Sequence, residues 1–209
     1  MQNRVTLAGL GAVAVALWIV GLVVGQALPS KLPSHATDQQ VLDWVSSNTN
    51  DIIIGAWLFM VGCIVFVAFA LLLRTRLPEG PLTTAFYTGA VMAAVGGLFT
   101  QGDFVTGINK GEVTPAAAAA AHHIGDLGFS VAELSLVLVF GALALLAFRA
   151  RVLPKWWGAI LGLFAVVAVI GPIGWTMVIF GAPLFTLVTP WLVGRGARRT
   201  AAAPATLTA

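Results

Sequence analysis

The sequence predicts an all-α protein, a polytopic bundle of six membrane-spanning helices. Of its 209 residues, 59% are hydrophobic and only 9% are charged, whereas soluble domains carry about 25% charged residues. The mean hydropathy is +0.96, and most of the chain lies in apolar stretches of about the 20 residues that a helix needs to cross a bilayer. The principal expected partner is therefore the lipid bilayer. Nucleic acid is not expected, because the basic residues lie between the apolar segments.

Polar, proline and glycine residues separate the apolar stretches. The longest polar stretch, Ser30 to Asn50, is interpreted as a loop, and Pro115 opens the fourth helix because a helix does not need an N–H group in its first turn. The uncharged run from Trp156 to Val193 is too long for one crossing at about 1.5 Å per residue. The Gly-Pro-Ile-Gly sequence at 171–174 is therefore predicted to fold this run into a hairpin. The expected helices cover about residues 5–28, 51–73, 82–101, 116–148, 156–171 and 175–193.

The basic residues predict how the chain is oriented. A single transmembrane domain, residues 1–194, is expected to precede a disordered, basic and alanine-rich cytoplasmic tail, residues 195–209. Positive charge is enriched in cytoplasmic loops, so the side with more bases is expected to be cytoplasmic and to hold both termini. The expected location is the inner (plasma) membrane of the cell, as a multi-pass protein. One side holds Arg4, Arg74, Arg76, Arg149, Arg151, Lys155, Arg195, Arg198 and Arg199, and the other holds Lys31 and Lys110.

The helix expected at 116–148 carries ionisable residues within an apolar segment. His122, Asp126 and Glu133 fall along one stripe of this helix. Glu133 is the deepest of them, and an ionised side chain in hydrocarbon costs about 2.5–3.5 kcal/mol even on a permissive scale, so such residues usually mark function. Burial favours the neutral acid, which suits a proton-binding group. The alternative is a purely structural hydrogen bond from protonated Glu133 to Gln101, Ser135 or a backbone carbonyl.

Further polar residues are expected on the same, outer side of the membrane. Gln101 and Asp103 end the helix at 82–101, and Asp51 begins the helix at 51–73. Together with Asp126 and Glu133 they are expected to form an outward-facing acidic pocket that binds a proton or a cation. The function favoured by this pattern is that of a small transporter or channel-like protein.

A metal site is a second interpretation of the same region. His122, His123 and Asp126 offer imidazole and carboxylate ligands, which suit zinc. His123 points about 100° away from His122 on a helix, so a real site would need a ligand from another helix, such as Asp103. The protein would then be a metal-dependent membrane enzyme acting on a lipid. A simpler account is that the three residues only cap the start of a helix at the interface.

The sequence identifies no catalytic residue and no particular cofactor. It contains no phosphate-binding loop, nucleophile elbow or dinucleotide fingerprint. The small-residue motifs Gly21-x-x-x-Gly25 and Gly158-x-x-x-Gly162 allow helices to approach closely. They are compatible with a homo-oligomer, and a third hypothesis is accordingly a non-catalytic accessory or assembly subunit.

Tryptophans are expected at the two membrane–water interfaces, where indole rings are enriched. Trp156 and Trp157 follow Lys155 directly, at the expected inner boundary. The others counted in this belt are Trp18, Trp175 and Trp191.

The Arg-Val-Leu-Pro-Lys-Trp-Trp-Gly turn at 151–158 lies between an alanine-, leucine- and glycine-rich helix and a glycine-rich hairpin. In these features the chain resembles small uncharacterised multi-helix membrane proteins of actinobacterial type. The resemblance covers the C-terminal half, and the whole chain only in hydropathy. It implies a helical membrane fold and no activity, so it assigns no functional residue.

Overall fold

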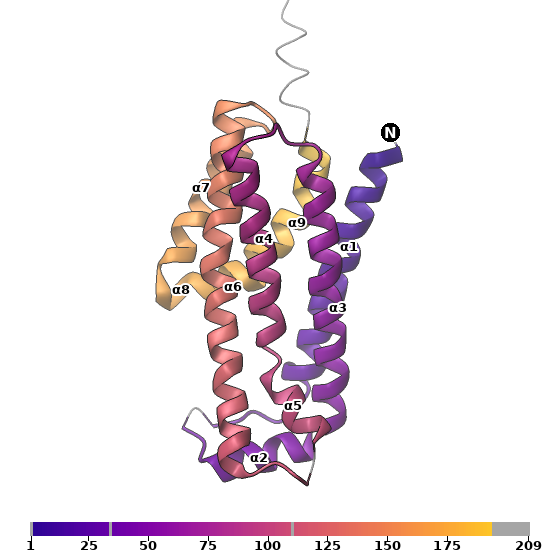
Figure 1. Cartoon of the computed structure of the whole chain (residues 1–209), viewed down its shortest axis with the longest axis vertical. Coiled ribbons are helices and arrows are strands. Elements are labelled where there is room, and N and C mark those ends of the chain that lie inside the picture. The colour runs from indigo at the N-terminus through magenta and orange to yellow at the C-terminus, as the bar shows by residue number, and fades with distance from the viewer. Residues whose placement is uncertain (1, 34, 110, 194–209) are drawn as a thin grey trace, which may run out of the picture.

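The computed structural model describes residues 2–33, 35–109 and 111–193, and the expected tail at 195–209 lies outside them. The described residues form helices joined by turns, with no strand among them. Five helical stretches are long and apolar enough to cross a membrane, at 5–27, 49–74, 81–108, 115–149 and 173–192. The chain is therefore a helical, membrane-embedded protein, and its long helices run side by side along one axis (Figure 1).

The first helix packs against the third through glycine. Helix α1 (Gln2–Leu22) continues into the π-helical turn η1 (Val23–Ala27), and both contact α3 (Thr49–Arg74). A Cβ atom added to Gly21 would lie 2.7 Å from the backbone nitrogen of Phe59, and one added to Gly55 would collide with the backbone of Gly25. The Gly21-x-x-x-Gly25 motif therefore already carries a contact within one chain.

A second pair of helices is equally close. Helix α4 (Pro81–Phe99) packs against α6 (Pro115–Arg149) and also contacts α3. A Cβ atom on Gly96 would lie 2.5 Å from the backbone nitrogen of Ala132, so only glycine fits there. The four helices α1, α3, α4 and α6 form the frame of the bundle (Figure 1).

Aromatic side chains fill the end of this frame where α3 and α6 terminate in arginine. The ring centroid of Phe185 lies 5.9 Å from Phe69, 6.4 Å from Phe86 and 5.9 Å from Phe140. All four side chains are fully buried. Four aromatic rings thus pack together in the interior of the bundle, towards its basic end.

The run from 156 to 193 folds back on itself, as the sequence predicts, but less deeply than two full spans. Helix α7 (Lys155–Val169) leads into α8 (Gly171–Thr176), the π-helical turn η2 (Met177–Gly181) and α9 (Ala182–Leu192). Figure 1 shows α8 at about half the height of the bundle, with α9 returning to the basic end. The 15 residues of α7 extend about 22 Å, which is less than the roughly 30 Å of a hydrocarbon core.

A polar contact joins the two arms of this hairpin. The indole N–H of Trp157 on α7 donates to the hydroxyl of Thr189 on α9 at 3.1 Å. Gly158 of α7 is buried against α6, where an added Cβ would come within 2.6 Å of the Ala147 side chain. The second glycine motif of the sequence thus also serves packing within the chain.

The interpretation of residues 30–50 as a loop is wrong, because helix α2 (Asp38–Ser47) lies there. Thr37 and Gln40 form a capping box, in which each side chain accepts a hydrogen bond from the other residue's backbone N–H, at 3.3 and 2.8 Å. This arrangement satisfies two N–H groups that a helix start leaves unpaired. The buried Val41 and Val45 fix the inner face of α2.

A second short helix, α5 (Gly102–Ile108), follows α4 and contacts α2, α3 and α6. A Cβ atom on Gly102 would collide with the backbone oxygen of Ala121, so α5 can lie directly on α6 only because residue 102 is glycine. Helices α2 and α5 cover the end of the bundle opposite the arginines (Figure 1).

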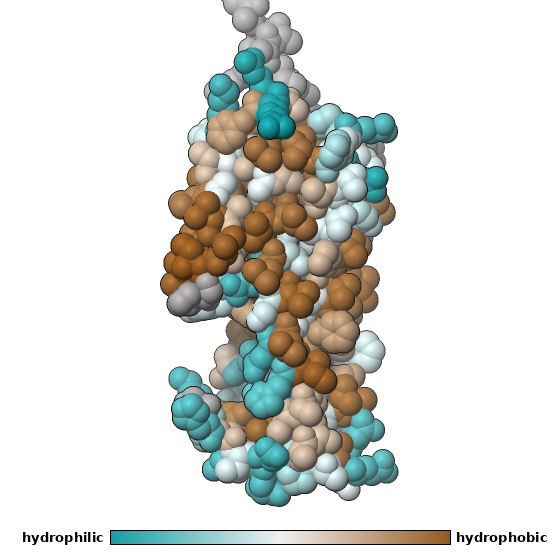
Figure 2. Space-filling view, turned by 60° about the vertical axis from the view of Figure 1, so that its left-hand side comes forward, coloured by the Kyte–Doolittle hydropathy of each residue, from teal (hydrophilic) through white to brown (hydrophobic). Residues whose placement is uncertain are grey.

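The surface agrees with a membrane setting. Figure 2 shows hydrophobic residues around the middle of the molecule and hydrophilic ones at its two ends. Of the tryptophans expected at the interfaces, Trp156 and Trp191 are about half exposed, at 56% and 53%. The expectation for Trp175 is wrong, because this residue belongs to α8, which lies at about half the height of the bundle (Figure 1). Trp157 is buried and donates to Thr189. The expectation for Trp18 is wrong, because its ring is buried and lies 5.0 Å from that of Phe66. Trp18 lies on the face of α1 that meets α3.

Replacing Gly55 with leucine tests the close α1–α3 contact. The new side chain has to push α1 away from α3, so we expect a loss of about 2 kcal/mol or more of stability. The measurement is thermal unfolding of the detergent-purified protein. Gly9→Leu is the matched control, since an added Cβ there meets nothing within 4 Å. Equal unfolding temperatures for the two variants would contradict the contact.

Candidate ligand-binding site

A cavity of about 390 Å³ lies at the end of the bundle covered by α2 and α5. We call it the polar cavity. Four of the residues singled out from the sequence line it, and they come from two segments of the chain that meet only in the folded structure: Gln101 and Asp103 at the start of α5, and His122 and Asp126 on α6.

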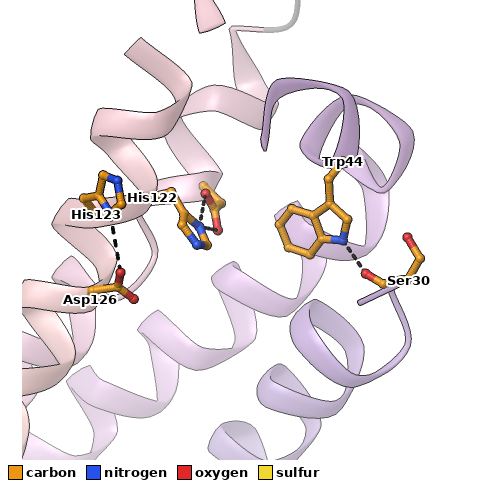
Figure 3. Close-up of polar contacts among 6 residues, drawn as sticks. Ser30, Trp44, His122, His123 and Asp126 are labelled. Atoms are coloured by element: carbon orange, nitrogen blue, oxygen red, sulfur yellow. Dashed lines mark hydrogen bonds and ion pairs between the residues drawn. The ribbon is translucent and has the colours of Figure 1, made fainter. Parts of the chain in front are cut away.

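The central contact of the polar cavity joins α5 to α6. Nδ1 of His122 lies 3.0 and 3.1 Å from the two carboxylate oxygens of Asp103 (Figure 3). Both side chains are partly exposed, at 30% and 20%. A carboxylate only accepts hydrogen bonds, so Nδ1 carries the proton of this contact and Nε2 is left for a ligand. Gly102 makes the contact possible by letting α5 rest on α6.

Aromatic residues of α2, α5 and α6 also line the cavity. Trp44 of α2 lies edge-on to His122, with ring centroids 6.5 Å apart and planes at 72° (Figure 3). Its indole N–H donates to the backbone oxygen of Ser30, which holds the ring in place. Phe104 and Phe129 also line the cavity. The cavity therefore combines carboxylates with aromatic faces.

Sequence reasoning missed Trp44, because the segment that carries it was interpreted as a loop. The signal that could have revealed it is the Thr37-x-x-Gln40 pattern, since a threonine or serine followed three residues later by glutamine or glutamate marks a helix start. With valines at 41 and 45 on one face, the pattern describes a short amphipathic helix that carries a tryptophan.

The second histidine takes no part in the cavity lining. Nδ1 of His123 lies 3.6 Å from a carboxylate oxygen of Asp126, and both side chains are about three-quarters exposed. Figure 3 shows this pair apart from the contact that His122 makes. In the described part of the chain, no three histidine, cysteine, aspartate or glutamate side chains come together as a metal would require. The structure thus gives no support to a zinc site at His122, His123 and Asp126.

Two other residues of the expected acidic pocket differ in their placement. Gln101 lines the polar cavity and donates through Nε2 to the hydroxyl of Thr100 at 2.6 Å. Asp51 lies in the first turn of α3, where its neighbour Ile52, and not Asp51 itself, lines the cavity.

Glu133 lies outside the polar cavity, under the turn of the α7–α9 hairpin. A Cβ atom added to Gly174 would lie 2.7 Å from the carboxyl carbon of Glu133 and would collide with its oxygen. The two side chains suggested as its partners bond elsewhere, since Ser135 donates to the backbone oxygen of Val131 at 2.6 Å and Gln101 donates to Thr100. The third alternative, a hydrogen bond to a backbone carbonyl, stays a prediction. The structure thus relates Glu133 to the packing of the hairpin rather than to the other acids.

A second cavity, of about 470 Å³, lies deeper in the bundle. We call it the apolar cavity. Trp18, Cys63 and Phe66 form part of its wall, and the small side chains of Ala93 and Ala94 leave the space open. Both π-helical turns line it, η1 through Val23 and Gln26 and η2 through Val178, Ile179 and Phe180. Such turns are frequent at functional sites.

Comparison of the chain with models of protein families, with curated proteins and with solved structures finds no match. The geometry of the two cavities is therefore the basis for the function proposed below.

Proposed function

We propose that the chain is a carrier-type membrane protein that binds an organic cation, an ammonium group, in the polar cavity. The observation that carries this proposal is the composition of the cavity wall. Its lining residues include Asp103 and Asp126 and the aromatic residues Trp44, Phe104 and Phe129, and none of the described residues that line it is a lysine or an arginine.

This combination suits an ammonium ion for two reasons. Carboxylates attract its charge, and aromatic faces, tryptophan above all, attract cations through the quadrupole of the ring, most strongly where water is excluded. A small hydrated metal ion would instead favour three or more oxygen or nitrogen ligands together. The contact between Nδ1 of His122 and the carboxylate of Asp103 holds that carboxylate in the cavity wall.

The packing of the other end favours a carrier over an open channel. Between the apolar cavity and the basic end, the buried rings of Phe69, Phe86, Phe140 and Phe185 pack against one another across the interior of the bundle. Passage of a cation to that side then requires a second arrangement of the helices, which is the defining property of a carrier.

For topology we propose six membrane-inserted helices, with α7 and α9 as the arms of a shallow hairpin. Because this hairpin returns to the end from which it starts, both termini lie on one side. Arg74, Arg149 and Lys155 lie at that end, and the positive-inside rule makes it cytoplasmic. The polar cavity then opens to the outside of the inner (plasma) membrane.

Labelling of introduced cysteines tests the orientation. Glu112 and Glu79 are exposed acids at opposite ends of the bundle, and the native Cys63 is buried. A membrane-impermeant maleimide added to intact cells is expected to label Glu112→Cys, and to label Glu79→Cys only after the membrane is permeabilised. The reverse pattern would contradict the proposed orientation.

Exchange of tetramethylammonium tests the function. Proteoliposomes loaded with this permanent cation are expected to take up its radiolabelled form faster than protein-free liposomes do. The Asp103→Asn variant removes the charge of the carboxylate that contacts His122, and we expect uptake to fall about tenfold, which corresponds to about 1.4 kcal/mol of binding free energy. Glu112→Gln is the matched control, because it removes an exposed acid at the same end that does not line the cavity.

The unfolding temperature of the Asp103→Asn variant separates function from folding. A partly exposed ion pair contributes at most about 1 kcal/mol to stability, so the variant should remain folded. Uptake by the wild-type protein no faster than by empty liposomes, or equal uptake by a folded Asp103→Asn variant, would contradict the proposal.

A further inference from the structure

We infer that the cation in the polar cavity carries a hydrocarbon chain, and that this chain lies in the apolar cavity. The ligand would be a single-chain amphiphile with a quaternary ammonium head. The inference rests on the proposed function for the head and adds the chemical class of the rest of the molecule.

The first argument is that the two cavities adjoin. Gln26, Thr100 and Phe129 line both of them, and these residues come from η1, the end of α4 and the middle of α6. On one side of these three shared residues lie Asp103 and His122, in the polar cavity. On the other side lies a wall that is almost wholly apolar. One ligand with a polar end and an apolar end would fill both spaces.

The second argument is the level of the junction in the membrane. Phe129 lies 20 residues before Arg149, and Thr100 lies 19 residues after Pro81. At about 1.5 Å per residue, both are about 30 Å from the basic end, which is the thickness of a hydrocarbon core. The polar cavity then lies at the level of the lipid headgroups and the apolar cavity at the level of the outer acyl chains. An amphiphile bound across the junction would keep the orientation that it has in the outer leaflet.

The third argument is access from the lipid. Ile19 of α1, Val23 of η1 and Phe180 of η2 line the apolar cavity, yet these residues are 44–64% exposed. They therefore form the rim of an opening on the membrane-facing side. Figure 2 shows the surface hollowed below the hydrophobic tip of the hairpin, above the hydrophilic end of the molecule. The incomplete depth of the hairpin is what leaves this space open. The hydrocarbon chain of a ligand could enter this space directly from the bilayer, without crossing water.

Binding of alkyltrimethylammonium ions of increasing chain length tests the inference. The protein in lipid nanodiscs is titrated calorimetrically with tetramethyl-, butyltrimethyl- and octyltrimethylammonium, with protein-free nanodiscs subtracted. We expect affinity to rise at least tenfold from the butyl to the octyl compound, because each buried methylene favours binding. Octyl sulfate, with the same chain and the opposite charge, should not show Asp103-dependent binding.

Two variants distinguish binding of the hydrocarbon chain in the apolar cavity from binding of the ammonium head in the polar cavity. Ile179→Trp places a large ring in the apolar cavity and should abolish the gain from the longer chain while leaving tetramethylammonium affinity unchanged. Ala94→Phe fills the same cavity from α4 and should act alike. Leu134→Trp, on a 60% exposed position of α6 outside both cavities, is the control for added aromatic bulk.

The outcomes distinguish this inference from the proposed function. If tetramethylammonium binds in an Asp103-dependent manner but the longer chain adds no affinity, or if the gain survives in folded Ile179→Trp and Ala94→Phe variants, the inference is overturned and the function stands. If no member of the series binds beyond the nanodisc background, both fail.

Discussion

The structure depends on one constraint, that a hydrocarbon layer about 30 Å thick cannot hydrogen-bond to polar groups. Each long helix therefore satisfies its own backbone and places its charged residues near its ends, as Arg74 on α3 and Arg149 on α6 show. The cluster around Asp103 and His122 obeys the same constraint, because it lies at the far end of α6, about 30 Å or more from Arg149. A binding site at this level can hold a charged group without moving charge into hydrocarbon.

Helix length and glycine placement together create the two cavities. Glycines at 21, 55 and 96 draw α1 onto α3 and α4 onto α6, so the frame is tight around its long axis. The α7–α9 hairpin closes only the basic end of that frame, since α7 has 15 residues. Beyond its tip the surface is hollowed (Figure 2), and the short helices α2 and α5 cover the end of the bundle opposite the arginines (Figure 1). The polar cavity and the apolar cavity thus adjoin at the level where the long helices leave the membrane.

The long helices could be predicted from the sequence, but the contacts between distant segments could not. Hydropathy is a strong signal over about 20 residues, and it placed α3 and α6 within two residues of their ends. Hydropathy does not predict α2, because the sequence signal for this helix is a capping pattern and two valines. Helical spacing suggested His122 beside Asp126, four residues away, yet His122 contacts Asp103, 19 residues away, because α5 docks through Gly102. The same spacing put Glu133 with the other acids, whereas the hairpin, whose depth no local pattern reveals, lies against it.

The measurement that tests the account most directly is the depth of α6 in the membrane. Spin labels at Ile124, Leu127, Leu134 and Leu138, all exposed on the outside of α6, report their immersion through collisions with oxygen and with a water-soluble nickel complex. We expect Ile124 and Leu127 to be accessible from water and Leu134 and Leu138 to be immersed, so that the boundary lies near Phe129. A boundary well before residue 122, with His122 immersed in hydrocarbon, would contradict a cation site at headgroup level.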